Sequence, residues 1–187
     1  MNITDTPTVV FVPGLRDHNP DHWQSLLADT LTNTRTVPPL THGTRNLDSR
    51  VAALDEVLSE VEGPVILVAH SAGVMITVHW AKQHIRQVVG ALLVTPPDFE
   101  SPMPEGHSNI QELEDAGWFP IPRERLPFPC VVVGSENDPL ATLDRATELS
   151  ESWGARLVNA GKVGHLNPAS GYGHWEQGHQ LLDELLK

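Results

Sequence analysis

The sequence predicts an α/β protein: a three-layer α/β/α sandwich with a mostly parallel sheet of about six strands. Short runs rich in β-branched residues recur along the chain, and they are apolar on both faces, as is typical of parallel strands covered by helices. Helical patterns separate these runs, and such alternation indicates right-handed crossovers. The 187 residues suffice for one substantial core, so we expect a single domain over residues 1–187.

The elements follow from these patterns in chain order. Four apolar runs predict strong strands, and two shorter, more polar runs predict weaker ones. The strong strands are expected at 8–12, 64–70, 88–95 and 130–134, and the weaker ones at 35–38 and 155–160. Helices are expected at 21–31, 47–61, 72–84, 139–153 and 174–186. Local periodicity does not determine the order of the strands in the sheet.

One long segment, 96–129, interrupts the alternation. It is rich in proline, glycine and acidic residues, with a short helical pattern at 109–116. Long irregular segments inside compact domains often form lids or binding loops, so this segment is a candidate for a minimal lid. Trp118 and Phe119 lie within it. They would either line a substrate pocket or anchor the loop on the core, and the sequence leaves both alternatives open.

The charge and hydropathy of the chain exclude several classes of partner. Its 24 acidic and 12 basic residues give a formal net charge of −12, which would repel nucleic acids and other long polyanions. No apolar stretch approaches the roughly 20 residues of a membrane-spanning helix. The N-terminus lacks the pattern of a secretory signal, so we expect a cytoplasmic protein with no membrane partner. Cys130 is the only cysteine and is expected to be a buried strand residue. The oligomeric state is not predicted.

Ser71 stands where an apolar strand passes into a helix, in the stretch VAHSAGV. Ligands of parallel α/β sheets bind beyond the carboxyl ends of the strands. A sharp strand-to-helix turn that exposes a serine there is a nucleophile elbow, with the pattern G-x-S-x-G. This chain has Ala69 in place of the first glycine and Gly73 at the second. An isolated serine at such a junction is more often a helix N-cap, so the interpretation depends on its partners.

A serine nucleophile needs a base to take its proton and an acid to orient that base. On folds with a nucleophile elbow, the chain order is serine, then aspartate or glutamate, then histidine. Asp138 follows the strand expected at 130–134, and His165 follows the one at 155–160. Order and position therefore predict a catalytic triad of Ser71, Asp138 and His165.

Two other carboxylates compete for the role of the acid. Glu136 lies two residues before Asp138, and Asp98 follows the preceding strand. Asp138 is favoured because Pro139 is typical of the first residue of a helix, which would leave Asp138 at the turn facing the site.

Other histidines compete with His165 for the role of the base. His70 is fixed beside the serine and cannot easily fold back onto it, whereas His174 and His179 fall on the last predicted helix. The chain has no H-E-x-x-H motif, and its scattered histidines lack the spacing of metal ligands. We therefore expect no metal site.

Acyl transfer also needs hydrogen-bond donors for the oxyanion that develops on the substrate. The backbone N–H of Ala72, at the start of the predicted helix, is one candidate donor. The second is expected from the loop after the first strand, where the stretch VPGLRDHN places Pro13 and Gly14 at a turn and Leu15 just beyond it. These positions predict an oxyanion hole formed by the N–H groups of Leu15 and Ala72.

Four stretches together resemble the small serine hydrolases related to YdeN and to retinoblastoma-binding protein 9, a branch of the α/β-hydrolase superfamily. They are FVPGLRDHNPDHWQSLL, VAHSAG, VVGSENDP and GHLNPASGYGHWEQG. The resemblance covers nearly the whole chain. It implies a compact α/β-hydrolase fold without the first antiparallel strands of larger relatives, with Ser71, Asp138 and His165 as the triad. The L-x-C-x-E segment associated with retinoblastoma binding is absent around Cys130, so that partner is not expected.

These observations predict a serine hydrolase that cleaves a small carboxylic ester through an acyl-enzyme on Ser71, with an amide or a thioester as the alternative substrate. The reaction requires no metal or organic cofactor. Two alternatives remain open. The fold could serve as a non-catalytic binding or regulatory module. The same triad could also support an acyltransferase or a lyase.

Overall fold

Six strands form one all-parallel sheet in the computed structural model, which describes residues 6–15, 19–40 and 45–187. The strand order is β2-β1-β3-β4-β5-β6. The strands are β1 (Thr8–Val12), β2 (Thr34–Thr36), β3 (Val65–His70), β4 (Val88–Val94), β5 (Cys130–Gly134) and β6 (Arg156–Asn159). The predicted fold class is confirmed.

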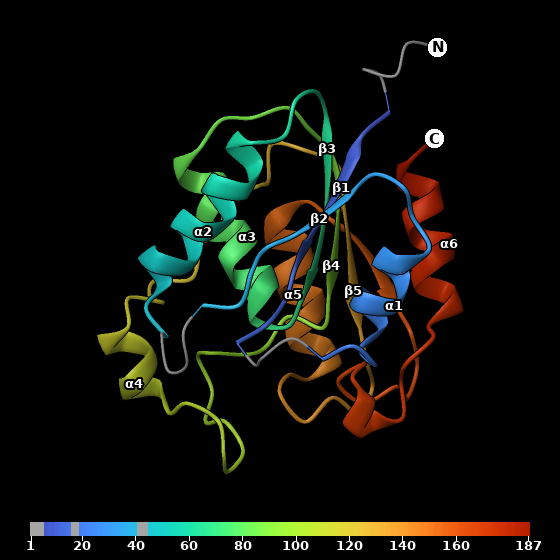
Figure 1. Ribbon diagram of the computed structural model, residues 1–187. Helices are drawn as coiled ribbons and strands as arrows, with labels where there is room; N and C mark the ends of the chain where they lie inside the picture. The colour runs from blue at the N-terminus through green and yellow to red at the C-terminus, as the bar shows by residue number, and fades with distance from the viewer. Residues whose placement is uncertain (1–5, 16–18, 41–44) are drawn as a thin grey trace.

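Helices cover both faces of the sheet (Figure 1). They are α1 (Trp23–Asp29), α2 (Leu47–Ser59), α3 (Ala72–Gln83), α4 (Ile110–Asp115), α5 (Leu143–Trp153) and α6 (Glu176–Leu185), with a short 3₁₀ helix, η2, at Pro168–Ser170. Buried residues of α2, α3 and α5 share one apolar core with one face of the sheet, and those of α1 and α6 share a second core with the other face.

The central strand β3 explains why the strand sequences are apolar at every position. Its residues Val65, Leu67 and Ala69 belong to the first core, and Ile66 and Val68 belong to the second. These five side chains are fully buried. A strand that is covered on both faces gains from an apolar side chain at each position, which is the pattern found in the sequence.

The expected elements all form, and most of their ends differ from the predicted ends by one or two residues. The exception is the helix expected from Pro139, which begins instead at Leu143. The expectation that Pro139 starts this helix was wrong. Thr142 is the N-cap, and its side chain accepts a hydrogen bond from the Arg145 N–H at 3.2 Å. A threonine hydroxyl satisfies an N–H of the first turn that would otherwise lack an acceptor, and this determines where the helix begins.

The segment between β4 and β5 packs onto the first core. Trp118 is fully buried, and its indole N–H donates to the backbone carbonyl of Arg45 at 2.7 Å. Its ring meets Phe99 edge-on with the ring centroids 5.1 Å apart. Phe119 is partly buried against the same core. Of the two alternatives for Trp118, the structure therefore favours an anchor, because the buried ring leaves no surface for a substrate.

Ion pairs hold the ends of this segment against α5. Asp98 Oδ2 lies 3.1 Å from Arg145 Nε, and Arg145 also contacts Glu148 at 2.8 Å. Arg123 pairs with both Glu100 and Glu148. Charges joined in a network contribute more to stability than an isolated surface pair does.

No helix among the described residues is both long and apolar enough to cross a membrane. The same residues include no group of three or more histidine, cysteine, aspartate or glutamate side chains arranged to hold a metal ion.

Candidate active site

Ser71 occupies a strained turn between β3 and α3. Its φ of 57° and ψ of −129° lie in a region that residues other than glycine rarely adopt. Its backbone N–H donates to Val94 O at 3.0 Å, and its carbonyl accepts from the Val74 N–H at 2.9 Å. The side chain makes no capping hydrogen bond to α3. The N-cap alternative therefore does not describe this serine, and the turn has the form of a nucleophile elbow.

Small residues allow the elbow to approach the end of β1. A Cβ atom at Gly73 would lie only 2.1 Å from the carbonyl oxygen of Val12 and 2.8 Å from that of Pro13. Ala69, which replaces the usual first glycine, is fully buried within β3. The close approach that requires glycine is thus at Gly73, and the methyl group of Ala69 is accommodated in the core.

Three side chains from distant parts of the sequence meet at this end of the sheet. His165 Nε2 lies 2.9 Å from Ser71 Oγ, and His165 Nδ1 lies 3.0 Å and 2.9 Å from the two carboxylate oxygens of Asp138. The side chains of His165 and Asp138 are only 7% and 3% exposed. A carboxylate can only accept, so Nδ1 carries the proton and Nε2 is left to accept from the serine hydroxyl. This arrangement is able to activate an alcohol.

Asp138 is held by its own turn and by the neighbouring loop. Its Oδ1 accepts a hydrogen bond from the Leu140 N–H at 2.9 Å, which forms a turn just after β5. Asn137 Oδ1 accepts from the Gly164 N–H at 2.7 Å. The second contact joins the loop that carries the acid to the loop that carries His165, so the two loops are positioned together.

The competing carboxylates point to other partners. Glu136 accepts a hydrogen bond from Asn159 Nδ2 at 3.0 Å on the exposed surface. Asp98 pairs with Arg145 Nε at 3.1 Å. Asp138 is thus the one of these three acids whose carboxylate the structure places against His165.

The backbone around His165 is fixed on both sides. Its N–H donates to Ser170 Oγ at 3.1 Å, and Ser170 is held in turn by Asn167 Oδ1. Gly164 adopts a φ of +60°, and a Cβ atom there would lie 2.5 Å from Ser170 Oγ. A glycine before the histidine is therefore needed for both conformation and space.

His70 is buried beside the triad and makes a contact that the sequence did not predict. It is 5% exposed, and its Nε2 lies 2.9 Å from the backbone carbonyl oxygen of His165. Burial, followed by the proximity of His165 and His22, lowers the pKa of His70 well below its usual value. The other competitors lie elsewhere: His174 is exposed, and His179 contacts Thr30 Oγ1 at 3.0 Å.

The buried state of His70 predicts that the protein loses stability in weak acid. Below the ordinary histidine pKa of 6.5 the unfolded chain takes up a proton that the folded His70 does not. The free energy of unfolding should then fall by up to about 1.4 kcal/mol per pH unit for this group. Urea unfolding between pH 7.5 and 5.5 measures the slope. His70→Gln should make it shallower, and His174→Gln, at an exposed position, should not. Equal slopes in both variants would contradict this prediction.

The two backbone N–H groups predicted for the oxyanion hole lie in the expected elements. Ala72 is the first residue of α3, so its N–H has no acceptor within the helix and lies at the positive end of the helix dipole. Leu15 follows Gly14, and a Cβ atom at Gly14 would lie 3.6 Å from Ser71 Oγ. The loop after β1 therefore runs directly past the serine.

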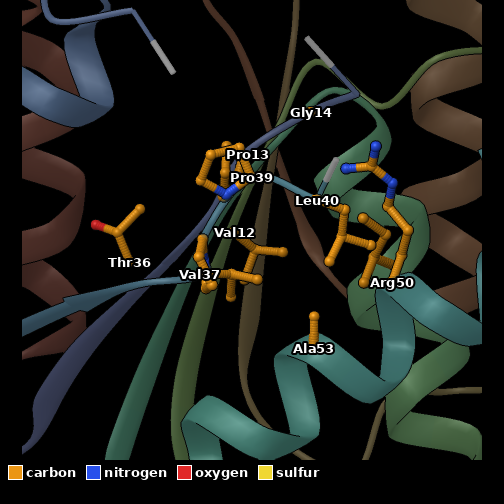
Figure 2. Close-up of a pocket in the computed structure, with 11 residues that line it drawn as sticks. Val12, Pro13, Gly14, Thr36, Val37, Pro39, Leu40, Arg50 and Ala53 are labelled. Carbon is orange, nitrogen blue, oxygen red and sulfur yellow. The ribbon is translucent and has the colours of Figure 1, made fainter. Parts of the chain in front are cut away.

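A small pocket, with a volume of about 30 Å³, adjoins this loop (Figure 2). Its wall is mostly apolar, with Thr36 and Arg50 as the residues with polar side chains. The lining residues are Val12, Pro13, Gly14, Thr36, Val37, Pro38, Pro39, Leu40, Arg50, Ala53 and Ile76. Because Gly14 also lies against Ser71, the pocket is next to the triad.

Comparisons with known proteins identify relatives along nearly the whole chain. A family model described as serine hydrolase matches residues 9–184. The crystal structure of a YdeN-like hydrolase from Pectobacterium atrosepticum is 31% identical, with a TM-score of 0.82, and the match covers 97% of this chain and 94% of that one. No curated protein matches the chain significantly.

Two more distant structures share the fold. The ydeN gene product of B. subtilis is 18% identical, with a TM-score of 0.77 and coverage of 96% of this chain and 98% of that one. Est1E from Butyrivibrio proteoclasticus is 12% identical, with a TM-score of 0.71 and coverage of 98% and 90%.

Proposed function

The chain belongs to the serine hydrolase family, and from this premise we propose that it hydrolyses small, uncharged carboxylic esters through an acyl-enzyme on Ser71. The observation that carries the proposal is the continuous chain of contacts from Ser71 Oγ through His165 to the Asp138 carboxylate, with distances of 2.9 Å at both ends. A pure binding module has no need for an alcohol, an imidazole and a carboxylate in this order.

The reaction would proceed in two steps. As Ser71 Oγ attacks the ester carbonyl, its proton passes to His165 Nε2, and Asp138 stabilises the imidazolium that forms. The N–H groups of Leu15 and Ala72 would hold the oxyanion. The intermediate then expels the alcohol, which takes the proton from His165, and leaves the acyl group on Ser71. In the second step His165 takes a proton from water as the water oxygen attacks the acyl carbonyl. The bond between the acyl carbon and Ser71 Oγ then breaks, His165 returns the proton to Oγ, and the carboxylic acid is released.

The surroundings of the serine support a small apolar acyl group as the substrate. The pocket beside Gly14 is mostly apolar and small, with a volume of about 30 Å³. The net charge of −12 disfavours anionic substrates. A panel of p-nitrophenyl esters from acetate to octanoate would measure the acyl preference. Product analysis with an added alcohol would distinguish hydrolysis from acyl transfer.

Labelling with a fluorophosphonate tests the proposal directly, because this reagent reacts with activated serines. We expect one equivalent of label on the native protein, located on Ser71 by peptide mass spectrometry, and none on the Ser71→Ala variant. A native protein that remains unlabelled would favour the binding-module alternative.

The burial of Cys130 predicts that thiol reagents leave the ester-cleaving activity intact. Burial raises the pKa of the Cys130 thiol to about 11. At pH 8 only about one molecule in a thousand would carry the reactive thiolate. Iodoacetamide should therefore modify Cys130 in urea but not in the folded protein, and ester turnover should be unchanged. Rapid alkylation of the folded protein with loss of activity would contradict this expectation.

A further inference from the structure

The backbone carbonyl of His165 is held by two buried side chains that the proposed reaction does not use. His70 Nε2 lies 2.9 Å from this carbonyl oxygen, and Thr95 Oγ1 lies 3.5 Å from it. His70 is 5% exposed and Thr95 is 1% exposed. Polar side chains are rarely buried so deeply without a structural or functional purpose, and here both are directed to one acceptor.

Backbone strain is concentrated at the same carbonyl. Within the described ranges, the residues other than glycine with positive φ are Ser71 at 57°, Thr95 at 46° and Leu166 at 46°. Ser71 directly follows His70, Thr95 is the second donor, and Leu166 directly follows His165. Each such conformation costs about 1–3 kcal/mol and persists only where the surrounding structure imposes it. The strain therefore marks a place where the position of the His165 backbone is strongly constrained.

The ring of His70 is itself fixed by aromatic neighbours. Its centroid lies 4.6 Å from that of His22 and 6.0 Å from that of Trp23, both in edge-on arrangements, and 5.0 Å from that of His165. Burial lowers the pKa of His70 and keeps the ring neutral, so only one of its two ring nitrogens carries a proton. A carbonyl oxygen can only accept, so the proton lies on Nε2 and the ring is a permanent donor to His165.

We propose that His70 is a positioning residue for the base, whose Nε2–H holds the carbonyl of His165 so that the imidazole stays aligned between Asp138 and Ser71. Ser170 already fixes the N–H of His165, and the contact with His70 fixes its carbonyl. With both backbone groups held, the side chain has a narrow range of positions. An error of about 1 Å in such a group can reduce turnover about 100-fold. This inference rests on the proposed hydrolase function.

Two variants of matched size test the contact. In His70→Gln the amide nitrogen can replace Nε2 as a donor, whereas His70→Met has a similar length and no donor. We expect His70→Gln to retain kcat within about threefold of the native value and His70→Met to lose about 10- to 100-fold, with KM nearly unchanged in both. Both variants lose the same aromatic ring, so a role confined to the packing of that ring would lower their kcat equally. Equal kcat values for Gln and Met would overturn the proposal.

A spectroscopic measurement decides the question independently of turnover. The proton between His165 Nδ1 and Asp138 should give a downfield NMR resonance in the native protein and in His70→Gln, and this resonance should be broadened or lost in His70→Met. An unchanged resonance in His70→Met would overturn the positioning role. Failure of the native protein to react with fluorophosphonate would instead overturn the hydrolase proposal, and the NMR comparison would still report whether His70 holds His165.

The second donor provides a parallel pair if the His70 variants do not fold. Thr95→Val removes the hydroxyl with little change in shape, and Thr95→Ser keeps it. We expect Thr95→Val to lose about three- to tenfold in kcat relative to Thr95→Ser. This loss is smaller than that expected for His70→Met, because the contact of Thr95 is longer. Equal kcat values in this pair would then overturn the proposal.

Discussion

The Asp138→Asn variant should lose about 10⁴-fold in kcat for a small ester while remaining folded. The asparagine Oδ1 can still accept the hydrogen bond from the Leu140 N–H, so the turn after β5 should persist. The amide nitrogen, however, would donate to His165 Nδ1 and force the ring proton onto Nε2. In that tautomer His165 cannot accept the proton of Ser71, although it remains within 2.9 Å of the hydroxyl.

Turnover of p-nitrophenyl acetate and the melting temperature together measure this effect. Glu136→Gln is the matched control, because Glu136 lies two residues away and contacts Asn159 instead of His165. It should retain activity within about twofold, as expected for a change away from the reacting groups. Near-native activity in Asp138→Asn would show that another carboxylate supplies the acid, and the same substitution at Asp98 would then identify it.

The second large effect is expected at the elbow itself. Gly73→Ala should destabilise the fold by about 3 kcal/mol, because the added methyl group would lie 2.1 Å from the Val12 carbonyl oxygen and no flexible side chain is available to move. Relief of this overlap requires the start of α3 to shift away from β1. Ser71 and the Ala72 N–H would shift with it, so turnover should also fall about 100-fold or more.

Gly90→Ala is the control for a glycine in the same sheet. A Cβ atom at Gly90 would lie 3.1 Å from Leu185 Cδ2, which is the end of a side chain that can rotate. The expected loss is about 1 kcal/mol, with activity unchanged. Urea unfolding and ester turnover measure both variants. If Gly73→Ala were as stable and as active as Gly90→Ala, the close approach of the elbow to β1 would not be required.

The fold could be predicted from the sequence because burial on both faces leaves a clear signal. In β3, each residue from Val65 to Ala69 is apolar and fully buried. The family membership was also predicted, from four stretches spread along the chain, and is confirmed. The positions of Ser71, Asp138 and His165 beyond strand ends could be predicted because parallel strands bring their carboxyl ends to one edge of the sheet.

Other features could not be predicted because they depend on contacts that leave no local pattern. Pro139 is typical of a helix start, but the Thr142 hydroxyl caps the helix three residues later. Trp118 lies in an irregular segment, and its burial, with its contacts to Arg45 and Phe99, shows that it is an anchor. The partner of His70 is a backbone carbonyl, and a backbone acceptor is present at every residue. The sequence around His165 therefore gives no sign that its carbonyl, among all the others, is the partner of His70.

The position of His165 beyond β6 has a consequence for how the protein becomes reactive. β6 pairs with β5 in parallel, and such pairing requires a crossover through α5 before the two strands can meet. Ser71 and His165 are 94 residues apart in the chain, and contacts of such long range form late and slowly during folding. During refolding, Ser71 should stay inert towards a serine-directed reagent until the last strand has docked. The fraction of molecules labelled at each time would then report how many have finished folding, and molecules that have collapsed without completing the sheet would remain unlabelled.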